Sequence, residues 1–143
     1  MSEQQPKPKV IDHTLRVRYA ETDAMGIVHH ASYLVYLEEA RTNYIRALGS
    51  SYAEFERSGY YLAVSEVNVR YGQAARYDDL LRIACWVAQT RSRGMTFAYE
   101  IYHAETAEKL ITATTKHICI DTDGKIARIP STWQIEADRK SVV

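Results

Sequence analysis

The chain contains few of the residues that mark disulfide-linked, membrane-spanning or nucleic-acid-binding proteins. Its 143 residues include two cysteines, three prolines and six glycines. Acidic and basic side chains number 18 each, so the formal net charge is zero. Nothing in that balance favours nucleic acid or an anionic membrane as a partner. No apolar run approaches the roughly eighteen residues of a membrane-spanning helix, so we expect no membrane insertion.

The scarcity of cysteine also bears on compartment and domain organisation. Cys85 and Cys119 both lie in apolar, strand-like runs, which favours buried reduced thiols over a disulfide or a nucleophile. The polar start, with Pro6 and Pro8, lacks the apolar core of a signal peptide. We therefore expect a cytoplasmic protein with one modest domain over 13–136. A flexible segment is expected over 1–12 and a tail over 137–143.

Phenylalanine and tryptophan are scarce, at two each, whereas tyrosine occurs eleven times. Tyrosine buries apolar area and keeps a polar tip, which suits interfaces and the walls of ligand sites. The bias therefore suggests a surface that binds a ligand or another subunit.

The most informative segment spans 19–44 and reads YAETDAMGIVHHASYLVYLEEARTNY. Before it, Leu15, Val17 and Tyr19 alternate with polar residues, which predicts a half-buried strand. After the loop, apolar residues recur at spacings of three and four and predict one face of a helix that begins at His30. That face consists of Tyr33, Leu34, Leu37, Ala40, Tyr44, Ile45 and Leu48. Gly49, followed by two serines, is expected to end the helix.

A carboxylate lies in the loop before this helix, because Asp23 precedes His30 by seven residues. The first amides of a helix lack intrahelical partners and carry the positive end of the macrodipole. Such amides can act as an oxyanion hole, in which one donor often lowers a barrier by ~3 kcal/mol. Gly26 lets the backbone turn and approach a ligand. Asp23 can then serve as a nucleophile or as a base for water.

Other roles for these residues remain open from residue type alone. Asp23 follows a threonine in a loop and could simply cap a turn. His29 and His30 could be surface or interface histidines, or half of a metal site. Adjacent histidines point in different directions, and neither an HxxxH nor an HExxH spacing is present. We expect no metal, since zinc sites typically need three or four ligands.

The remainder of the chain predicts a short helix followed by an antiparallel sheet. Segment 51–62 reads as a short helix and a turn at Gly59, and alternating patterns predict strands over 63–71, 80–89, 95–103 and 110–121. Asp123-Gly124 predicts a turn into a short last strand over 126–129. One helix followed by strands is typical of an α+β fold with the helix on one face. The strand from Leu80 is apolar on both faces, which favours association with another subunit.

Several motifs resemble the 4-hydroxybenzoyl-CoA thioesterase family of hot-dog-fold proteins, particularly its YbgC-like acyl-CoA thioesterase branch. The loop pattern TD-x-x-G, with its following histidine and tyrosine, is in register from Thr22 to Tyr33, and EEAR follows. VNVRYGQAARYDDLLRI at 67–83 and GKIARIPSTW at 124–133 resemble two further family segments. Met25 stands where the family often has a smaller residue, which narrows the expected acyl pocket. Ala74 stands where the family often has proline.

The resemblance implies a hot-dog fold, with a curved antiparallel sheet of five to six strands wrapped around one long helix. It implies a homo-oligomer, a dimer or homotetramer, whose active sites are shared between subunits. It also implies an acyl-CoA thioesterase, a hydrolase that releases a free acid and CoA and needs no cofactor. The alternatives are a non-catalytic acyl-CoA-binding protein and a hot-dog dehydratase, whose differently spaced motifs are not found.

The resemblance further assigns individual residues by position. Asp23 matches the catalytic carboxylate, and His30 matches the position whose amide faces the thioester carbonyl. Tyr19 matches an aromatic residue that accompanies them. Gly26, Val28 and Tyr33 belong to the loop motif and are expected at the substrate. The phosphates of CoA call for a basic rim, for which Arg91 and Arg93 are the best candidates, although arginines on a turn are often simply solvated.

Overall fold

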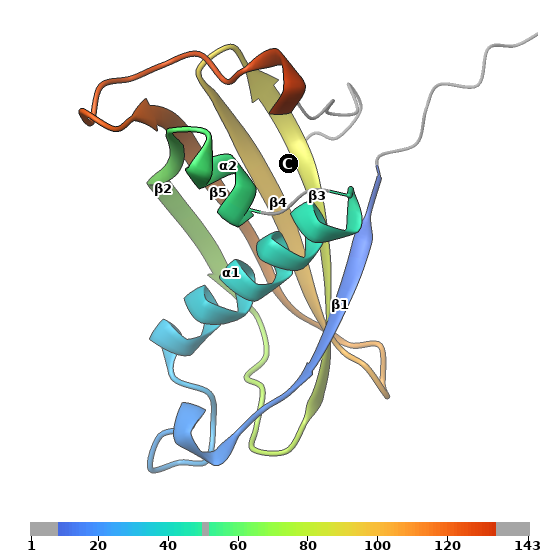
Figure 1. Ribbon diagram of the computed structural model, residues 1–143. Coiled ribbons are helices and arrows are strands. Elements are labelled where there is room, and N and C mark those ends of the chain that lie inside the picture. The colour runs from blue at the N-terminus through green and yellow to red at the C-terminus, as the bar shows by residue number, and fades with distance from the viewer. Residues whose placement is uncertain (1–8, 50–51, 134–143) are drawn as a thin grey trace, which may run out of the picture.

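The computed structural model describes residues 9–49 and 52–133. Its centre is one five-stranded antiparallel sheet in the order β1-β3-β4-β5-β2. The strands are β1 (Ile11–Arg16), β2 (Tyr60–Tyr71), β3 (Leu80–Arg91), β4 (Gly94–His103) and β5 (Lys109–Asp121). The long helix α1 (His30–Ala47) lies across the concave face, and the short helix α2 (Tyr52–Arg57) leads into β2 (Figure 1). The predicted α+β architecture is confirmed.

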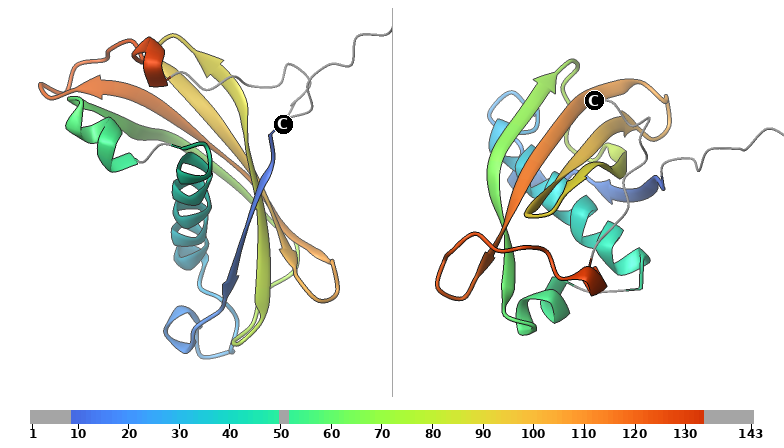
Figure 2. Two further views of the ribbon diagram at one scale, coloured as in Figure 1. Left: turned by 45° about the vertical axis from the view of Figure 1, so that its right-hand side comes forward. Right: turned by 90° about the horizontal axis from the view of Figure 1, so that it is seen from above.

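The sheet curls around α1, which covers its inner face, and no helix of the described residues lies on the outer face (Figure 2). The strands supply the inner wall of the core with large residues that are almost fully buried, namely Leu81, Ile83, Phe97, Tyr99, Ile101 and Ile111. Cys85 and Cys119 are free and buried, as predicted. Burial raises the pKa of both thiols, which makes them poor nucleophiles.

The buried face of α1 differs from the predicted one at two positions. Tyr36 is buried, whereas Leu34 is 44 % exposed. A buried tyrosine needs a partner for its hydroxyl, and Tyr36 has one because its hydroxyl donates to Glu21 Oε1 at 2.8 Å. The helix ends at Ala47, and Gly49, the predicted stop, follows the C-cap residue Leu48 with a φ of +89°.

A chain of polar side chains runs through the core beneath α1. Arg41 Nη1 donates to the Tyr99 hydroxyl at 3.2 Å, and that oxygen lies 2.6 Å from Thr115 Oγ1. Thr115 Oγ1 lies 2.8 Å from His117 Nε2. His117 is 3 % exposed. Its burial and the positive charge of Arg41 lower its pKa to about 4.

Three predicted boundaries are wrong, the first being that β2 begins at Tyr60 and not at residue 63. The first strand ends at Arg16, and the chain then forms the 3₁₀ turn η1 (Tyr19–Glu21), in which Tyr19 is 78 % exposed. The predicted strand over 126–129 is reduced to one bridge between Ile120 and Ile126. The reason is that the Ile129 amide donates to the Ser92 carbonyl at 2.8 Å, so this segment crosses to the β3–β4 turn. It then reaches the 3₁₀ turn η2 (Ser131–Trp133).

Several predictions from the sequence concern residues that lie outside the described ranges. The predicted flexible start falls largely on 1–8, and the predicted tail over 137–143 lies wholly beyond residue 133. The serines at 50 and 51, expected at the end of α1, also lie outside the described residues. None of the helices in the described part of the chain has the length and apolar character needed to cross a membrane.

Candidate active site

The loop between η1 and α1 is a tight turn stabilised by its own backbone. The Asp23 amide donates to the Ile27 carbonyl at 2.8 Å, and the Gly26 amide donates to the Asp23 carbonyl at 3.0 Å. Thr22 and Val28 form a bridge just outside this turn. Gly26 takes a φ of +78°, a left-handed conformation that glycine adopts without strain. Gly26 therefore closes the turn that presents Asp23.

The two carboxylate oxygens of Asp23 have different surroundings. Oδ1 accepts hydrogen bonds from the amides of Met25, at 2.8 Å, and Ile27, at 3.3 Å. Oδ2 has no hydrogen-bond partner among the described residues. Asp23 therefore does stabilise its own turn, as the simpler interpretation of the sequence held. The same contacts fix the carboxylate and leave its second oxygen available to a ligand.

Two amides at the start of α1 are also unpaired. His29 stands at the N-cap position, but its side chain makes no capping hydrogen bond. The His29 amide donates to the Glu21 carbonyl at 2.9 Å, and the Ser32 amide donates to the His29 carbonyl at 3.0 Å. Within 9–49 and 52–133, the amides of His30 and Ala31 find no acceptor. This positive helix end can therefore receive a carbonyl oxygen.

The side chain of His30 belongs to an aromatic group at the end of β2. Its ring centroid lies 4.9 Å from that of Tyr71, which lies 5.6 Å from that of Tyr33. The Tyr33 hydroxyl accepts a hydrogen bond from the Ala75 amide at 3.0 Å, and burial raises its pKa. Tyr33 is thus a buried residue that supports the site from below. Tyr71, which the sequence did not single out, is the residue that orients the His30 ring.

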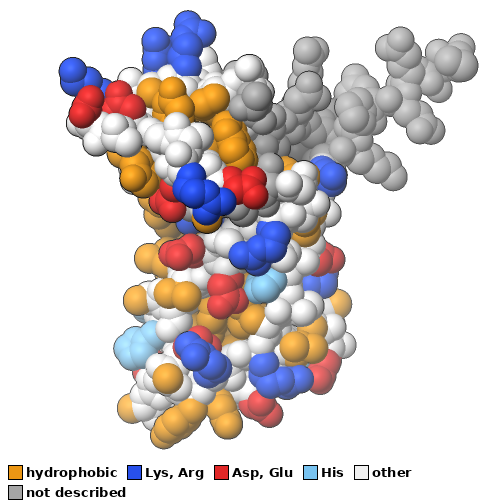
Figure 3. All heavy atoms as spheres, in the orientation of Figure 1, with side chains coloured by type: hydrophobic (Ala, Val, Ile, Leu, Met, Phe, Trp, Pro, Cys, Tyr) orange, Lys and Arg blue, Asp and Glu red, His pale blue; other side chains and the backbone are white. Residues whose placement is uncertain are grey.

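The predicted catalytic residues share one end of the molecule, but in the described part of the chain their side chains make no hydrogen bond or ring contact with one another. Tyr19 packs edge-on against Tyr77, with ring centroids 5.7 Å apart. Its main-chain carbonyl accepts hydrogen bonds from the amide and hydroxyl of Thr22. Hydrophobic side chains gather at this end in the space-filling view (Figure 3). Tyr19, Met25 and Tyr77 are among its exposed large residues.

Segment 72–77, which precedes β3, supports the loop from the other side. The Val28 amide donates to the Ala75 carbonyl at 2.9 Å, and the Tyr77 amide donates to the Gly26 carbonyl at 3.3 Å. Val28 itself is 3 % exposed. Its side chain therefore anchors the loop in the core, and only its backbone is near the site.

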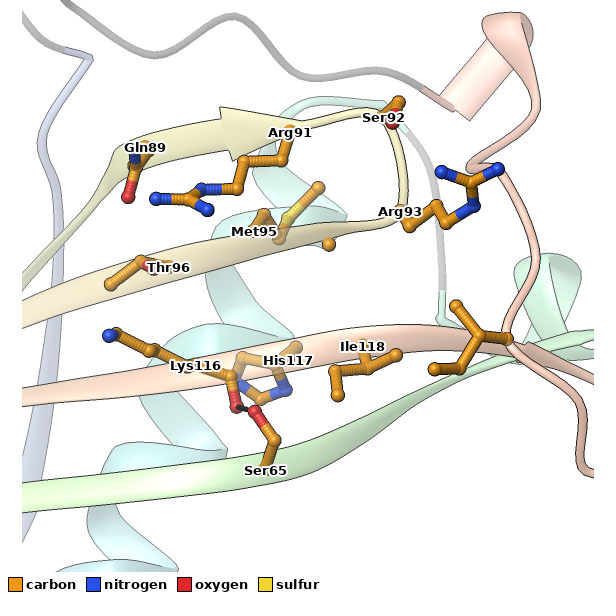
Figure 4. A pocket seen from close by; sticks show the side chains of 12 residues that line it. Ser65, Gln89, Arg91, Ser92, Arg93, Met95, Thr96, Lys116, His117 and Ile118 are labelled. Atoms are coloured by element: carbon orange, nitrogen blue, oxygen red, sulfur yellow. Dashed lines mark hydrogen bonds between the residues drawn. The ribbon is translucent and has the colours of Figure 1, made fainter.

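The two predicted phosphate-binding arginines lie at the other end of the sheet. Arg91 ends β3 and Arg93 precedes β4, in the turn opposite to the start of α1 (Figure 1). They line a groove of about 420 Å³ on the outer face, together with Gln89, Thr96, Lys116 and others. Figure 4 shows Arg91 directed over the sheet and Arg93 directed toward the segment that follows β5. One chain therefore does not bring these arginines next to Asp23.

Sequence reasoning missed Glu21, which makes more contacts than the loop residues that were predicted. Its carboxylate accepts from the Tyr36 hydroxyl, from the Arg18 amide, both at 2.8 Å, and from Arg18 Nε at 3.0 Å. Burial by itself would raise the pKa of Glu21, but these hydrogen bonds hold it below the usual value. The spacing of Arg18 and Glu21, three residues apart, was the available signal.

The described residues contain no group of three or more His, Cys, Asp or Glu side chains arranged to hold a metal ion. The groups available for chemistry at this end of the molecule include a carboxylate oxygen and two helix-start amides. These are the elements that acyl transfer requires.

Comparison with known proteins gives a consistent result. A family model described as the thioesterase-like superfamily matches residues 17–136. The putative acyl-CoA thioesterase YneP of Bacillus subtilis is 38 % identical over 109 residues, which cover 76 % of this chain and 78 % of that protein. The acyl-CoA thioester hydrolase YbgC of Escherichia coli is 34 % identical over 107 residues, or 75 % and 79 % of the two chains. A DHNA-CoA thioesterase structure from Staphylococcus aureus is 35 % identical, with a TM-score of 0.80 over 83 % of this chain and 80 % of that one.

Proposed function

Because the chain belongs to the thioesterase-like superfamily, we propose that it hydrolyses acyl-CoA thioesters with Asp23 as the catalytic carboxylate. Its curved five-stranded sheet around α1 has the hot-dog fold of the solved thioesterases that it resembles. Membership of a thioester hydrolase family defines the reaction class. The residues that perform the reaction, and the subunits that supply them, are the proposed part.

The observation that carries this proposal is that one carboxylate oxygen and two amides at the start of α1 lack hydrogen-bond partners among the described residues. Asp23 Oδ2 has no partner in the described part of the chain, and neither have the amides of His30 and Ala31. A thioester carbonyl that accepts from these amides gains stabilisation as negative charge develops on its oxygen.

Two routes lead from this arrangement to the products. Asp23 Oδ2 attacks the carbonyl carbon and forms an acyl anhydride that water then hydrolyses, or it removes a proton from a water that attacks directly. In both routes the bond between carbon and sulfur breaks, and CoA leaves as a thiolate that takes up a proton. His30 and Tyr19 are proposed to orient the carboxylate or the water.

Arg91 and Arg93 lie far from Asp23 in one chain, and this arrangement is explained if two chains share each active site. In one chain, the Tyr71 end of β2 lies at His30, and Ala63 pairs with Ile118, which also pairs with Gly94 at the β3–β4 turn. Antiparallel pairing of two β2 strands about their middle would place opposite ends together. Asp23 of one chain would then approach Arg91 and Arg93 of the other.

The exposed surface of β2 supports this pairing. β2 forms an edge of the sheet, so one side of its backbone has no neighbouring strand among the described residues. Tyr61, Val64, Val67 and Tyr71 are all large apolar residues of β2 that are 39–50 % exposed. A long, apolar, exposed edge is a site for pairing with another chain. We propose a homodimer formed at β2 and place the phosphates of CoA at the groove beside the β3–β4 turn.

The central experiment replaces Asp23 with asparagine, which keeps the acceptor for the Met25 and Ile27 amides and removes the negative charge. Release of free thiol from a panel of acyl-CoAs is expected to fall by about 10³-fold or more, since covalent or base catalysis is lost. The dissociation constant for CoA is expected to stay within a few-fold. Asp12→Asn is the matched control, because Asp12 lies on β1 and contacts Arg82 at the surface.

The same experiment separates the alternative of a non-catalytic acyl-CoA-binding protein. That alternative has support in the turn-stabilising contacts of Asp23 Oδ1. If the wild type binds acyl-CoA but releases no thiol from any member of the panel, the binding function replaces the enzymatic one. Thiol release that survives Asp23→Asn would remove Asp23 from the mechanism.

A further inference from the structure

Glu21 is the residue on which contacts from both sides of the candidate site converge. Its carboxylate accepts from the Tyr36 hydroxyl on α1, and from the main chain and the guanidinium of Arg18, which precedes η1. Both of its oxygens are thus occupied, and its side chain is 14 % exposed. Unlike Asp23, Glu21 offers no free oxygen to a substrate.

The main chain of Glu21 closes the loop that carries Asp23. Its carbonyl accepts from the His29 amide at 2.9 Å and from the Ser32 hydroxyl at 3.4 Å. His29 and Ser32 flank the two unpaired amides of the helix start. The carbonyl of Glu21 therefore takes the neighbouring donors and leaves the amides of His30 and Ala31 open.

These contacts determine where Asp23 stands relative to α1. Asp23 is two residues from Glu21, and hydrogen bonds of the Asp23 backbone and of Oδ1 stabilise its turn. The support from segment 72–77 reaches Gly26 and Val28, in the second half of the loop. In the described residues, the link from the first half of the loop to α1 consists of the contacts of Glu21 with His29, Ser32 and Tyr36.

We propose that Glu21 is a positioning residue, which holds Asp23 at the start of α1 through the hydroxyl of Tyr36. The inference rests on the proposed function of Asp23 and adds a residue that does not touch the substrate. Its physical basis is that a carboxylate and an oxyanion site must keep a fixed separation. A displacement of about 1 Å from such a geometry can cost up to 10²-fold in rate.

The sharpest test removes a single oxygen atom. Tyr36→Phe keeps the buried ring and deletes the donor to Glu21 Oε1. The value of kcat is expected to fall about 10-fold, with KM for acyl-CoA within about two-fold, because the substrate contacts remain and the alignment is lost. Glu21→Gln is expected to lower kcat by a similar factor, since the amide nitrogen of glutamine cannot accept from Arg18.

Tyr44→Phe is the matched control for the stability of α1. Tyr44 lies on the same helix and is as deeply buried as Tyr36, and its ring packs edge-on against Phe97 of β4, far from the loop. This variant is expected to lower the melting temperature as much as Tyr36→Phe does, with kcat unchanged. An equal loss of kcat in both variants would show that the effect is one of general stability and would overturn the proposal.

A second measurement decides the proposal without any activity. Hydrogen exchange of the peptide covering 22–32 reports the hydrogen-bonded amides of Met25, Ile27 and His29. Exchange there is expected to rise several-fold in Tyr36→Phe and in Glu21→Gln, and to stay at the wild-type rate in Tyr44→Phe. Wild-type exchange in the first two variants would overturn the positioning role, whereas thiol release by Asp23→Asn would overturn only the proposed function.

Discussion

At the scale of single residues, Asp23 and Glu21 lie in the same loop but differ in role because their carboxylates have different hydrogen-bond partners. Both carboxylate oxygens of Glu21 accept hydrogen bonds and its side chain is largely buried, so its charge stabilises the loop. Asp23 uses Oδ1 for its own turn and keeps Oδ2 free. The residue types alone do not distinguish them. The distinction comes from Tyr36 and Arg18, whose side chains reach Glu21 and not Asp23.

The contributions of the backbone amide and of the side chain of His30 can be tested separately. His30→Pro removes the amide that is proposed to face the carbonyl. Proline is tolerated at the first helical position, and His29 before it has a φ of −59° and a ψ of 141°, which suits a residue preceding proline. We expect kcat to fall by about 10²–10³-fold, the usual loss for one oxyanion donor. Steady-state kinetics with an acyl-CoA provides the measurement.

His30→Ala is the comparison for that experiment, because it keeps the amide and removes the ring that packs on Tyr71. A loss of at most about 10-fold is expected, since only an orienting contact disappears. If the alanine variant lost as much activity as the proline variant, the side chain and not the amide would be the essential part of His30.

His117 makes the stability of the protein depend on pH. Its folded pKa is about 4, against 6.5 for an ordinary histidine. Between these values the unfolded chain binds a proton that the folded chain does not, so the free energy of unfolding falls as the pH falls. From pH 7.5 to pH 4 the loss from this residue is on the order of 3 kcal/mol. Urea denaturation at several pH values measures it.

His117→Gln is the control for the pH experiment, because glutamine can still contact Thr115 but does not titrate. Its free energy of unfolding is expected to lack the decline that begins near pH 6.5. Glu21, whose pKa lies below its usual 4.5, contributes stability that is lost only below about pH 4.5. A decline of equal size in His117→Gln above that pH would assign the effect to other groups.

At the scale of elements, periodicity predicted most of the fold because each long element buries one regular face. The strand predicted over 80–89 is β3, and that over 110–121 is β5, each extended by at most two residues. The error at Tyr36 arose because its burial depends on a hydrogen bond to a residue fifteen positions earlier. The error over 126–129 arose because Ile129 pairs with the backbone of Ser92. Neither contact is visible in local spacing.

The residues of the candidate site likewise fall into those that local sequence signals predicted and those that depend on tertiary contacts. The sequence predicted the loop, the helix start and Gly26, because these follow from local turn and helix signals. It did not predict Glu21 or Tyr71, whose importance depends on contacts made after folding. It also grouped Arg91 and Arg93 with Asp23, although one chain places them at opposite ends of the sheet. Which ends meet depends on the other subunit.

The β3–β4 turn gives a test of how tightly an element is constrained. A Cβ at position 94 would overlap the carbonyl oxygen of His117 on β5. Gly94→Ala is therefore expected to lower the free energy of unfolding by about 1–3 kcal/mol, the usual cost of overpacking. It should also raise KM for acyl-CoA, because the turn carries Arg91 and Arg93. Urea denaturation and steady-state kinetics provide the two measurements.

Ser92→Ala is the matched control in the same turn. The Ser92 side chain is exposed, and its contact with Ile129 is made by its carbonyl oxygen. The free energy of unfolding is expected to stay within about 0.5 kcal/mol of the wild type. A Gly94→Ala variant as stable as this control would mean that β4 and β5 can separate slightly at no cost.

At the scale of the whole molecule, the proposed site needs two chains, and complementation tests it directly. Asp23→Asn in one chain and Arg91→Ala with Arg93→Ala in another should each impair activity. Co-expression is expected to restore about a quarter of the wild-type specific activity, because half of randomly formed dimers are mixed and each has one intact site of two. Thiol release by the whole pool of co-expressed dimers is the measurement.

The outcome for a site contained in one chain is different. Every active centre in the mixture would then carry one of the defects, and co-expression would give no more than the mean activity of the two separate variants.

Val67→Lys, which places a charge on the exposed face of β2, is expected to shift the protein toward monomer in sedimentation and to lower its activity in parallel.

The exposed edge of β2 also has a consequence for the cell. If half of each catalytic centre arrives with a second copy, mass action links the working fraction of the enzyme to its abundance. A newly made chain would remain idle until it met another, and a cell that synthesised little of the protein would obtain less than a proportional share of its turnover.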